Sequence, residues 1–435
     1  MRQYVTYLRL DQFDNFTQAR NKAIFTSQRN RIQQPEHVQQ PGGEGIKQVV
    51  PVWDIAWLFI ATRLLLILVT YISFILFPVP AHVYPNTPVD LIGLLTSWNH
   101  WDAANYTSIA EFGYTRVELT AFFPLFPILI KAFAFLLGNQ GYIAIGMIIS
   151  NLALLGSLFV LYQLAADVLG EQAGRRTLLY LCIFPTAFFF FAAYNESLFL
   201  FLTASSFLAM RRKKWWLAAG LGFFAALTRS AGLFLVIPFL YEIWVSNESS
   251  GHASRALTRK LPGLLPRALP VILIPLGTLL YCLYTWYAFG NPFAFASVQI
   301  YWARHLSWPW IGIWLALVDL FWATPFGSFY EVHTLIDLTA TVGFIVLAVI
   351  GWRRLRTSYN LWLVILLLFM LISPATTQHD ALQSNQRFVL EMFPAFITLA
   401  ALGIKHHRLH QALILLFPTL QAVFAMLFVL NRWMV

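Results

Sequence analysis

The sequence predicts an all-α polytopic membrane protein, and two observations carry this prediction. Of its 435 residues, 59% are hydrophobic and only 11% are charged, whereas soluble domains are roughly 45–50% apolar and about 25% charged. Several apolar runs exceed the ~18–20 residues that a helix needs to cross a bilayer. We expect about 11 transmembrane helices, and roughly 10 to 13 would fit the same pattern.

Composition also excludes several classes of function. The net charge of +10 is explained by cytoplasmic loops rich in Lys and Arg, and no basic, aromatic-interleaved soluble surface indicates nucleic acid as a partner. Cys182 and Cys282 both lie inside apolar runs, which excludes a disulfide framework and a zinc site. The sequence holds no P-loop, Rossmann fingerprint, HExxH or Asp-x-Asp. A lipid-linked phosphate donor therefore fits a membrane enzyme better than a nucleotide sugar.

The chain divides at about residue 50. Residues 1–50 are polar, Gln-rich and basic, and they predict a disordered cytoplasmic tail. Residues 51–435 are expected to form the transmembrane domain. Its first span covers about Val52 to Phe77. Arg63 inside that span should face protein or water, because an arginine in lipid costs roughly 2.5–3.5 kcal/mol on insertion scales.

The distribution of charge predicts the topology of the remaining chain. Basic clusters near residues 175, 211–214, 255–267, 353–356 and 405–408 should be cytoplasmic, which places the acidic segment 79–120 outside. Because successive spans cross the membrane in alternating directions, Ala121–Leu137 is expected to be an interfacial, non-crossing helix. Residues 79–137 would then form one outer segment. Trp308–Thr324 should not cross either, and the run 215–245 should be two short spans that meet at Arg229. The other spans are expected at about 142–162, 177–193, 196–210, 268–289, 332–352, 360–375, 387–403 and 411–431.

Asp102 is the first candidate for chemistry. It follows Trp98 and Trp101 in the outer segment and precedes an expected short helix from Ala103 to Phe112. An Asp at this junction could accept a proton from an acceptor hydroxyl. It could equally be only the N-cap of the helix, a position where Asp is preferred. The spacing of the residues does not distinguish a base from an N-cap.

Further candidate residues lie at the ends of later spans. Glu196 in Asn195-Glu196-Ser197 could bind a polar substrate group, or it could be a solvated loop carboxylate. Arg229 and Arg387 could hold a phosphate through their guanidinium groups, and the alternative is an interfacial arginine that snorkels. His379 and Asp380 could be metal ligands, but two residues are a weak signal.

Five strings, in this order, resemble the glycosylphosphatidylinositol mannosyltransferase II family, the PIG-V type, of the GT-C glycosyltransferase superfamily. The strings are WDAANYTSIAEFGY, AFFPLFP, AAYNESLF, LTRSAGLFLVIP and NQRFVLEMFPAF. The resemblance runs from about residue 53 to 403. The short chain and minimal loops suggest a prokaryotic member.

The resemblance implies inverting transfer of a sugar, mannose in the family, from a polyprenyl-phosphate donor to a hydroxyl of a lipid or glycan acceptor. The site would face the outside of a prokaryotic plasma membrane. No cofactor or metal is predicted, and membrane lipids are the other expected partner. The main rival is a transporter or flippase of lipid-linked sugars.

The resemblance also implies a role for each candidate residue. Asp102 would be the general base, Glu196 and Asn195 would contact the sugar or acceptor, and Arg229 and Arg387 would hold the donor phosphate. Where such families carry Pro-Arg-Tyr, this chain has Gln386-Arg387-Phe388. The residues that would shape the loop around the substrate are Trp101, Tyr106 and Tyr114.

Overall fold

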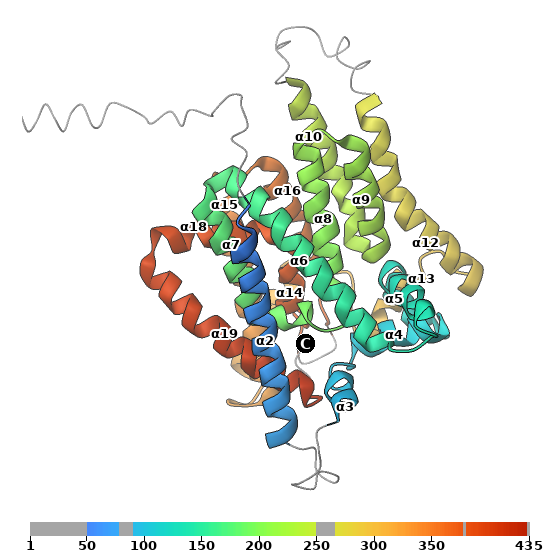
Figure 1. Ribbon diagram of the computed structural model, residues 1–435, viewed down its shortest axis with the longest axis vertical. Helices are drawn as coiled ribbons and strands as arrows, with labels where there is room; N and C mark the ends of the chain where they lie inside the picture. Colours follow the sequence, from blue (N-terminus) through green and yellow to red (C-terminus); the bar gives the residue numbers. More distant parts are fainter. Residues whose placement is uncertain (1–49, 78–89, 249–265, 377–379, 433–435) are drawn as a thin grey trace, which may run out of the picture. The chain divides into compact units, whose positions relative to one another are not determined.

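The computed structural model describes residues 50–77, 90–248, 266–376 and 380–432 (Figure 1). The expected N-terminal tail thus lies outside the described residues except for Val50, from which onward the chain forms one compact unit. Helices are the regular secondary structure of the described parts, apart from one isolated bridge between Arg304 and Ala375. The all-α prediction is confirmed.

Long apolar helices dominate these parts. Five are long and apolar enough to cross a membrane, and a bent pair would make a sixth. The five are α2 (Val52–Leu76), α6 (Tyr142–Leu169), the segment Pro266–Phe289 that contains η4 (Leu269–Ile272) and α12 (Leu273–Phe289), α15 (Phe329–Gly351) and α19 (His407–Val429). The count of about 11 crossings stays a prediction.

Shorter apolar helices complete the bundle. They are α5 (Leu125–Leu136), α9 (Trp215–Thr228), η3 (Ser230–Leu235) with α10 (Val236–Glu248), α14 (Ile311–Val318) with the π-helix η6 (Asp319–Ala323), and α16 (Thr357–Leu371). The predicted break between two short spans is confirmed, because Arg229 stands in extended conformation between α9 and η3. α5 has 12 residues, fewer than the ~20 that a straight span needs, and its interfacial, non-crossing placement stays a prediction.

Two predicted spans are wrong, and prolines explain both. Instead of a span over 177–193, α7 covers Glu171–Ile183 and ends before Pro185, because the residue preceding a proline avoids the helical region. Instead of one straight span over 387–403, Asn385–Glu391 and Phe393–Lys405 meet at 86°. Pro394 supplies no amide to the preceding turn and clashes with its carbonyls. These pieces are α17 (Asn385–Phe388), η7 (Val389–Glu391) and α18 (Phe393–Lys405).

The helices that frame the later site pack in a continuous series. α6 contacts α7 and α8 (Glu196–Arg211), α8 contacts α9, and α9 contacts α12, as the green to yellow ribbons of Figure 1 show. α18 contacts α7, and α19 contacts α2. Arg63 of α2 is buried, and its Nη1 donates to Asn151 Oδ1 of α6 at 3.2 Å. The prediction that Arg63 faces protein is confirmed.

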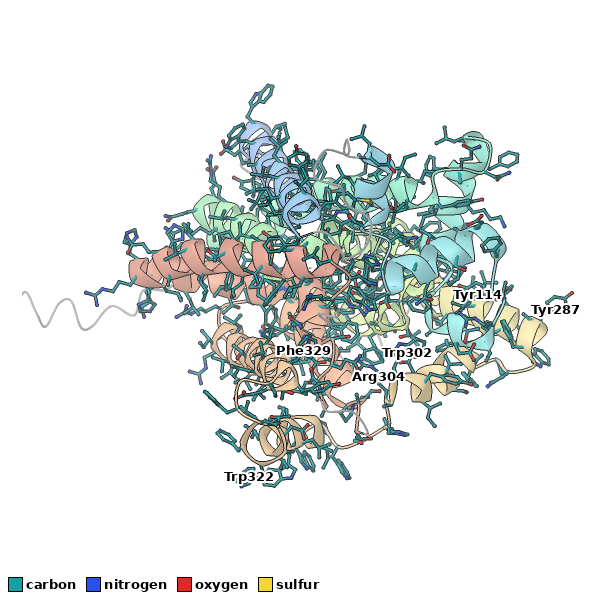
Figure 2. All side chains as sticks on the ribbon, turned by 90° about the horizontal axis from the view of Figure 1, so that it is seen from below. Tyr114, Tyr287, Trp302, Arg304, Trp322 and Phe329 are labelled. Atoms are coloured by element: carbon teal, nitrogen blue, oxygen red, sulfur yellow. The ribbon has the colours of Figure 1, made fainter. Side chains whose placement is uncertain are left out.

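Short helices lie between the long ones. α14 and η6 each carry one exposed tryptophan, Trp314 and Trp322, and such residues are typical of a membrane interface. In Figure 2, Tyr287 and Trp322 project from the edge of the view. The remaining short elements are α3 (Leu91–Thr96), α4 (Asp102–Phe112), η1 (Val117–Ala121), η2 (Ala187–Phe190), α13 (Ala294–Ser297) and η5 (Val298–Trp302).

Candidate functional site

Four charged residues from distant parts of the chain meet where helices begin or end. Asp102 begins α4, Glu196 begins α8, Arg229 follows α9, and Arg387 lies in α17. Beside them is a cavity of about 800 Å³. Its wall includes Trp101, Asp102, Tyr106, Asn195, Arg229 and Arg387, which are six of the eight predicted site residues.

Asp102 does not cap its helix. The expected start at Ala103 is wrong, because Asp102 is the first helical residue and Trp101 is the N-cap residue, without a side-chain cap bond. Trp101 has a φ of +47°, rare for a residue other than glycine, and its ring packs on Phe428 with centroids 5.1 Å apart. The Asp102 carboxylate instead accepts from Arg387 Nη1 at 2.5 Å. A full guanidinium charge binds a carboxylate more strongly than a helix amide does.

An alternating chain of ion pairs extends from Asp102. Arg387 Nε lies 3.4 Å from Glu196 Oε1, and Arg229 Nη1 lies 3.1 Å from the same oxygen. Arg229 Nη1 also lies 2.7 Å from Glu391 Oε1. Two guanidinium groups are therefore matched by three carboxylates.

The ion pairs exclude two alternative interpretations, one for Glu196 and one for Arg229. Glu196 is only 1% exposed and lies between two arginines, so it is not a solvated loop carboxylate. It lies behind the arginines and does not line the cavity. Arg229 is not a snorkelling side chain either, because its guanidinium contacts Glu196, Glu391 and the Asn195 side chain, whose Oδ1 accepts at 3.1 Å.

Arg387 is held by the surroundings of α17. The Gln386 amide donates to Asp337 Oδ1 at 2.7 Å, and the Gln386 carbonyl accepts from the Thr186 hydroxyl at 2.7 Å. Ser384 precedes α17 with a φ of +72°. Backbone conformations of this kind cost of order 1–3 kcal/mol and persist where the surroundings fix them. Both segments that carry the Asp102–Arg387 pair thus begin with a non-glycine residue at positive φ.

The two predicted tyrosines, Tyr106 and Tyr114, line different cavities in the structure. Tyr106 lines the cavity and is packed edge-on against Phe122 and Phe126, and burial raises the pKa of its phenol well above the usual value, so it stays protonated. Tyr114 lines a different groove of about 440 Å³, together with Tyr281. Its hydroxyl donates to the Phe122 carbonyl at 2.6 Å. Tyr114 thus supports the fold beside the cavity that contains Asp102.

Sequence reasoning missed two charged residues of this cavity, Glu391 and Arg304. Glu391 follows Arg387 by four residues in one of the quoted strings, and that spacing could have indicated it. Arg304 stands in no such string. Its guanidinium packs on the ring of Phe388. The centroid of that ring lies 5.1–5.3 Å from the guanidinium carbons of Arg229, Arg304 and Arg387.

The predicted weak metal pair is only partly described. His379 lies outside the described residues, and Asp380 is buried with Oδ1 accepting from the Leu382 amide at 3.1 Å. Within the described ranges, no group of three or more His, Cys, Asp or Glu side chains is placed to hold a metal ion.

Comparisons with known proteins place the chain near one family. No family model matches it. It is 36% identical over 166 residues to GPI alpha-1,6-mannosyltransferase 2 of Rattus norvegicus and 34% identical over 166 residues to the Homo sapiens protein of that name. Each match covers 35% of this chain and 34% of the relative, so it spans about one third of the length of these relatives. The resemblance to the glycosylphosphatidylinositol mannosyltransferase II family is confirmed, whereas the prokaryotic origin stays a prediction.

Solved structures give a weaker similarity. The oligosaccharyltransferase of Archaeoglobus fulgidus tethered with an acceptor peptide aligns with a TM-score of 0.41 and 12% identity, over 87% of this chain and 55% of that chain. The Archaeoglobus fulgidus oligosaccharyltransferase AglB in complex with an inhibitory peptide and a dolichol-phosphate aligns with a TM-score of 0.39 and 11% identity, over 87% and 56%. Both TM-scores lie below 0.5, so nothing further is concluded from these alignments.

Proposed function

We propose that this integral membrane protein is a glycosyltransferase that moves a sugar, mannose, from a polyprenyl-phosphate donor to a hydroxyl of a lipid or glycan acceptor. The observation that carries the proposal is the position of Asp102. Its carboxylate stands on the wall of a cavity of about 800 Å³, with one oxygen held by Arg387. The names of the similar proteins, mannosyltransferases of GPI, support the same class of reaction.

Asp102 acts as the general base. Among the described residues only Arg387 binds its carboxylate, and it does so through Oδ2, so Oδ1 can accept a proton from the acceptor hydroxyl. The acceptor oxygen, which loses its proton to Asp102, attacks the anomeric carbon of the sugar. The bond from that carbon to the phosphate oxygen breaks. Polyprenyl phosphate leaves with the bonding electrons. A single displacement inverts the configuration at the anomeric carbon.

The neighbouring residues position this base and its substrates. Trp101 and Tyr106 give the cavity an aromatic wall beside Asp102, against which a sugar ring can pack. Asn195 stands on the wall with its amide bound to the Thr228 carbonyl at 2.9 Å. Glu196 acts indirectly, since it fixes the arginines from behind.

We also propose that the transfer needs no divalent metal. Asp102, Glu196 and Glu391 each lie within 3.4 Å of an arginine nitrogen, and that arginine would compete with a metal ion for each carboxylate. Turnover should therefore survive a chelator such as EDTA. Loss of turnover that Mg²⁺ or Mn²⁺ restores would contradict this part of the proposal.

The site is proposed to face outward, which cysteine labelling can test. Thr115 and Lys213 are both exposed, and they lie on opposite sides in the predicted topology. Ser358 is unsuitable because it is buried against Glu242. In a Cys282→Ser background, an impermeant maleimide on intact cells should label Thr115→Cys and not Lys213→Cys. The opposite pattern would reverse the orientation.

The activity is tested with the purified full chain. Polyprenyl-phosphate mannose with a radiolabelled sugar is supplied together with extracted membrane lipids, and GDP-mannose serves as the control donor. We expect labelled product and free polyprenyl phosphate from the lipid-linked donor alone. Movement of the donor between bilayer leaflets without formation of a glycosidic bond would favour the flippase and overturn the proposal.

A further inference from the structure

Arg304 differs from the other two arginines of the cavity in its partners. It follows η5 and Ala303, and its guanidinium donates to two backbone carbonyls, Ser373 at 3.0 Å and Gln383 at 2.7 Å. Figure 2 shows Arg304 beside Trp302 toward the middle of the view. Neutral carbonyls fix the position of the guanidinium and leave its charge in place.

Among the described residues no carboxylate forms an ion pair with Arg304, and Asp337, Asp102 and Asp380 act on its charge only from beyond ion-pair distance. At the cavity, Arg229 and Arg387 share three carboxylates, whereas Arg304 shares none of them. Burial lowers the pKa of Arg304 to about 10, so the side chain is still protonated at neutral pH. Arg304 is half-buried, and a cation that has lost part of its hydration without gaining an ion pair carries a desolvation penalty. An anion that enters the cavity would relieve this penalty.

The position of Arg304 indicates what kind of anion fits. Its segment lies beside the end of α16, since the Ser307 amide donates to the Ile372 carbonyl at 2.9 Å. On this side the cavity wall is apolar, with Leu306, Phe369 and Ile372. On the other side Arg304 contacts Phe388, the neighbour of Arg387. The cation therefore stands where the charged wall meets the apolar wall, which suits a phosphate attached to a hydrocarbon chain.

We propose that Arg304 binds the phosphate of a polyprenyl phosphate, whose chain lies along the apolar wall, and that Arg229 and Arg387 serve mainly to hold the carboxylates. The proposal rests on the proposed function for the identity of the donor and changes the assignment of its phosphate. In the ion-paired arrangement, a phosphate at Arg387 would have to displace Asp102. Arg304 offers its charge without such a cost.

A binding experiment without any sugar transfer tests this assignment. The purified full chain in nanodiscs is titrated with polyprenyl phosphate, polyprenol and inorganic phosphate. Arg304→Gln should weaken binding of polyprenyl phosphate about 10-fold or more, because the phosphate loses a charge-assisted hydrogen bond. Polyprenol binding should not change. Arg116→Gln, which removes an exposed arginine of the outer segment, is the matched control.

Arg304→Lys separates charge from support of the fold. It keeps the charge and loses the fork that reaches two carbonyls, so it should still bind polyprenyl phosphate more tightly than polyprenol. If Arg304→Gln and Arg304→Lys lose both lipids equally, the residue is structural and the proposal is overturned. Equal affinity of the unaltered protein for inorganic phosphate would overturn the lipid part. Binding that holds while transfer fails would contradict only the proposed function.

Discussion

Asp102 and Arg387 stand 285 positions apart in the chain, and their side chains form an ion pair of 2.5 Å at the wall of the cavity. The pair joins the start of α4 to α17. Because Arg387 also lies 3.4 Å from Glu196, the orientation of the proposed base depends on a buried carboxylate that does not reach the cavity. The chemistry of Asp102 is therefore sensitive to changes at some distance from it.

Asp102→Asn should lower turnover by about 10²- to 10⁴-fold, the contribution typical of a positioned general base. An asparagine keeps the size of the side chain and an oxygen that can accept from Arg387, so folding and donor binding should persist. Turnover at saturating donor and the unfolding temperature in detergent are the two measurements. Glu111→Gln, an exposed carboxylate on the same helix, is the control and should change neither. Full turnover in Asp102→Asn would remove the residue from the mechanism.

Arg229 and Glu391, 2.7 Å apart, are expected to be strongly coupled in stability. Arg229→Met leaves Glu391 without a cation at ion-pair distance among the described residues, and breaking a buried pair in this way typically costs about 3–5 kcal/mol. Glu391→Leu should cost less, because Arg229 still lies 3.1 Å from Glu196. Arg229→Met and Glu391→Leu should each destabilise the fold, and the double variant should cost less than their sum by roughly 0.5–3 kcal/mol. Unfolding of all four proteins in detergent measures this. Additive effects would show that the two charges do not depend on each other.

The close approach of α6 to the segment before Asn195 should depend on Gly146. A Cβ atom at this position would lie 2.8 Å from the Ala193 Cβ and 3.1 Å from Ile130 Cδ1. Gly146→Ala should therefore shift Ala193 and lower both stability and turnover. Gly220→Ala is the control, because nothing lies within 4 Å of its Cβ and alanine favours a helix interior by roughly 0.5–1 kcal/mol. Equal behaviour of the two variants would mean that α6 does not position the site.

Local signals in the sequence predict those features that depend on local physics. The length of the apolar runs predicts the long helices. The free-energy cost of a cation in lipid predicts that Arg63 is buried against protein. Arg229 lies at the junction of two short apolar runs, and this position likewise predicts a break in the helix. Hydropathy alone extends two helices too far, because Pro185 ends one of them and Pro394 bends the other.

The partners of the charged residues could not be read from the sequence. Asp102 looks like a helix cap because a cap is the nearest local partner, and its true partner lies 285 positions away. Arg304 has no local signal at all, and it reaches the cavity through contacts with Ser373, Gln383 and Phe388. Such partners follow from tertiary packing, which a single sequence does not specify residue by residue.

Asp380 should make the stability of the protein depend on pH. The residue lies outside the helices, and burial is the main cause that raises the pKa of its carboxyl above the usual value. Asp337 forms a side-chain hydrogen bond with it, and Asp319 and Arg304 are the charged groups that face it. Since the unfolded carboxyl titrates near 3.9, the folded state binds its proton more tightly. The resulting stabilisation is present below about pH 4 and is lost as the pH rises through the raised pKa of the folded state.

Asp380→Asn removes this loss, because the amide is neutral at every pH and can still accept from the Leu382 amide. The variant should therefore gain stability relative to the unaltered protein as the pH rises from about 4 to neutrality. Unfolding temperatures of both proteins in detergent, measured at several pH values, give the difference directly. Other carboxylates titrate in both proteins and largely cancel in that difference. A difference that does not change with pH would show that the Asp380 carboxyl titrates alike in the folded and unfolded states.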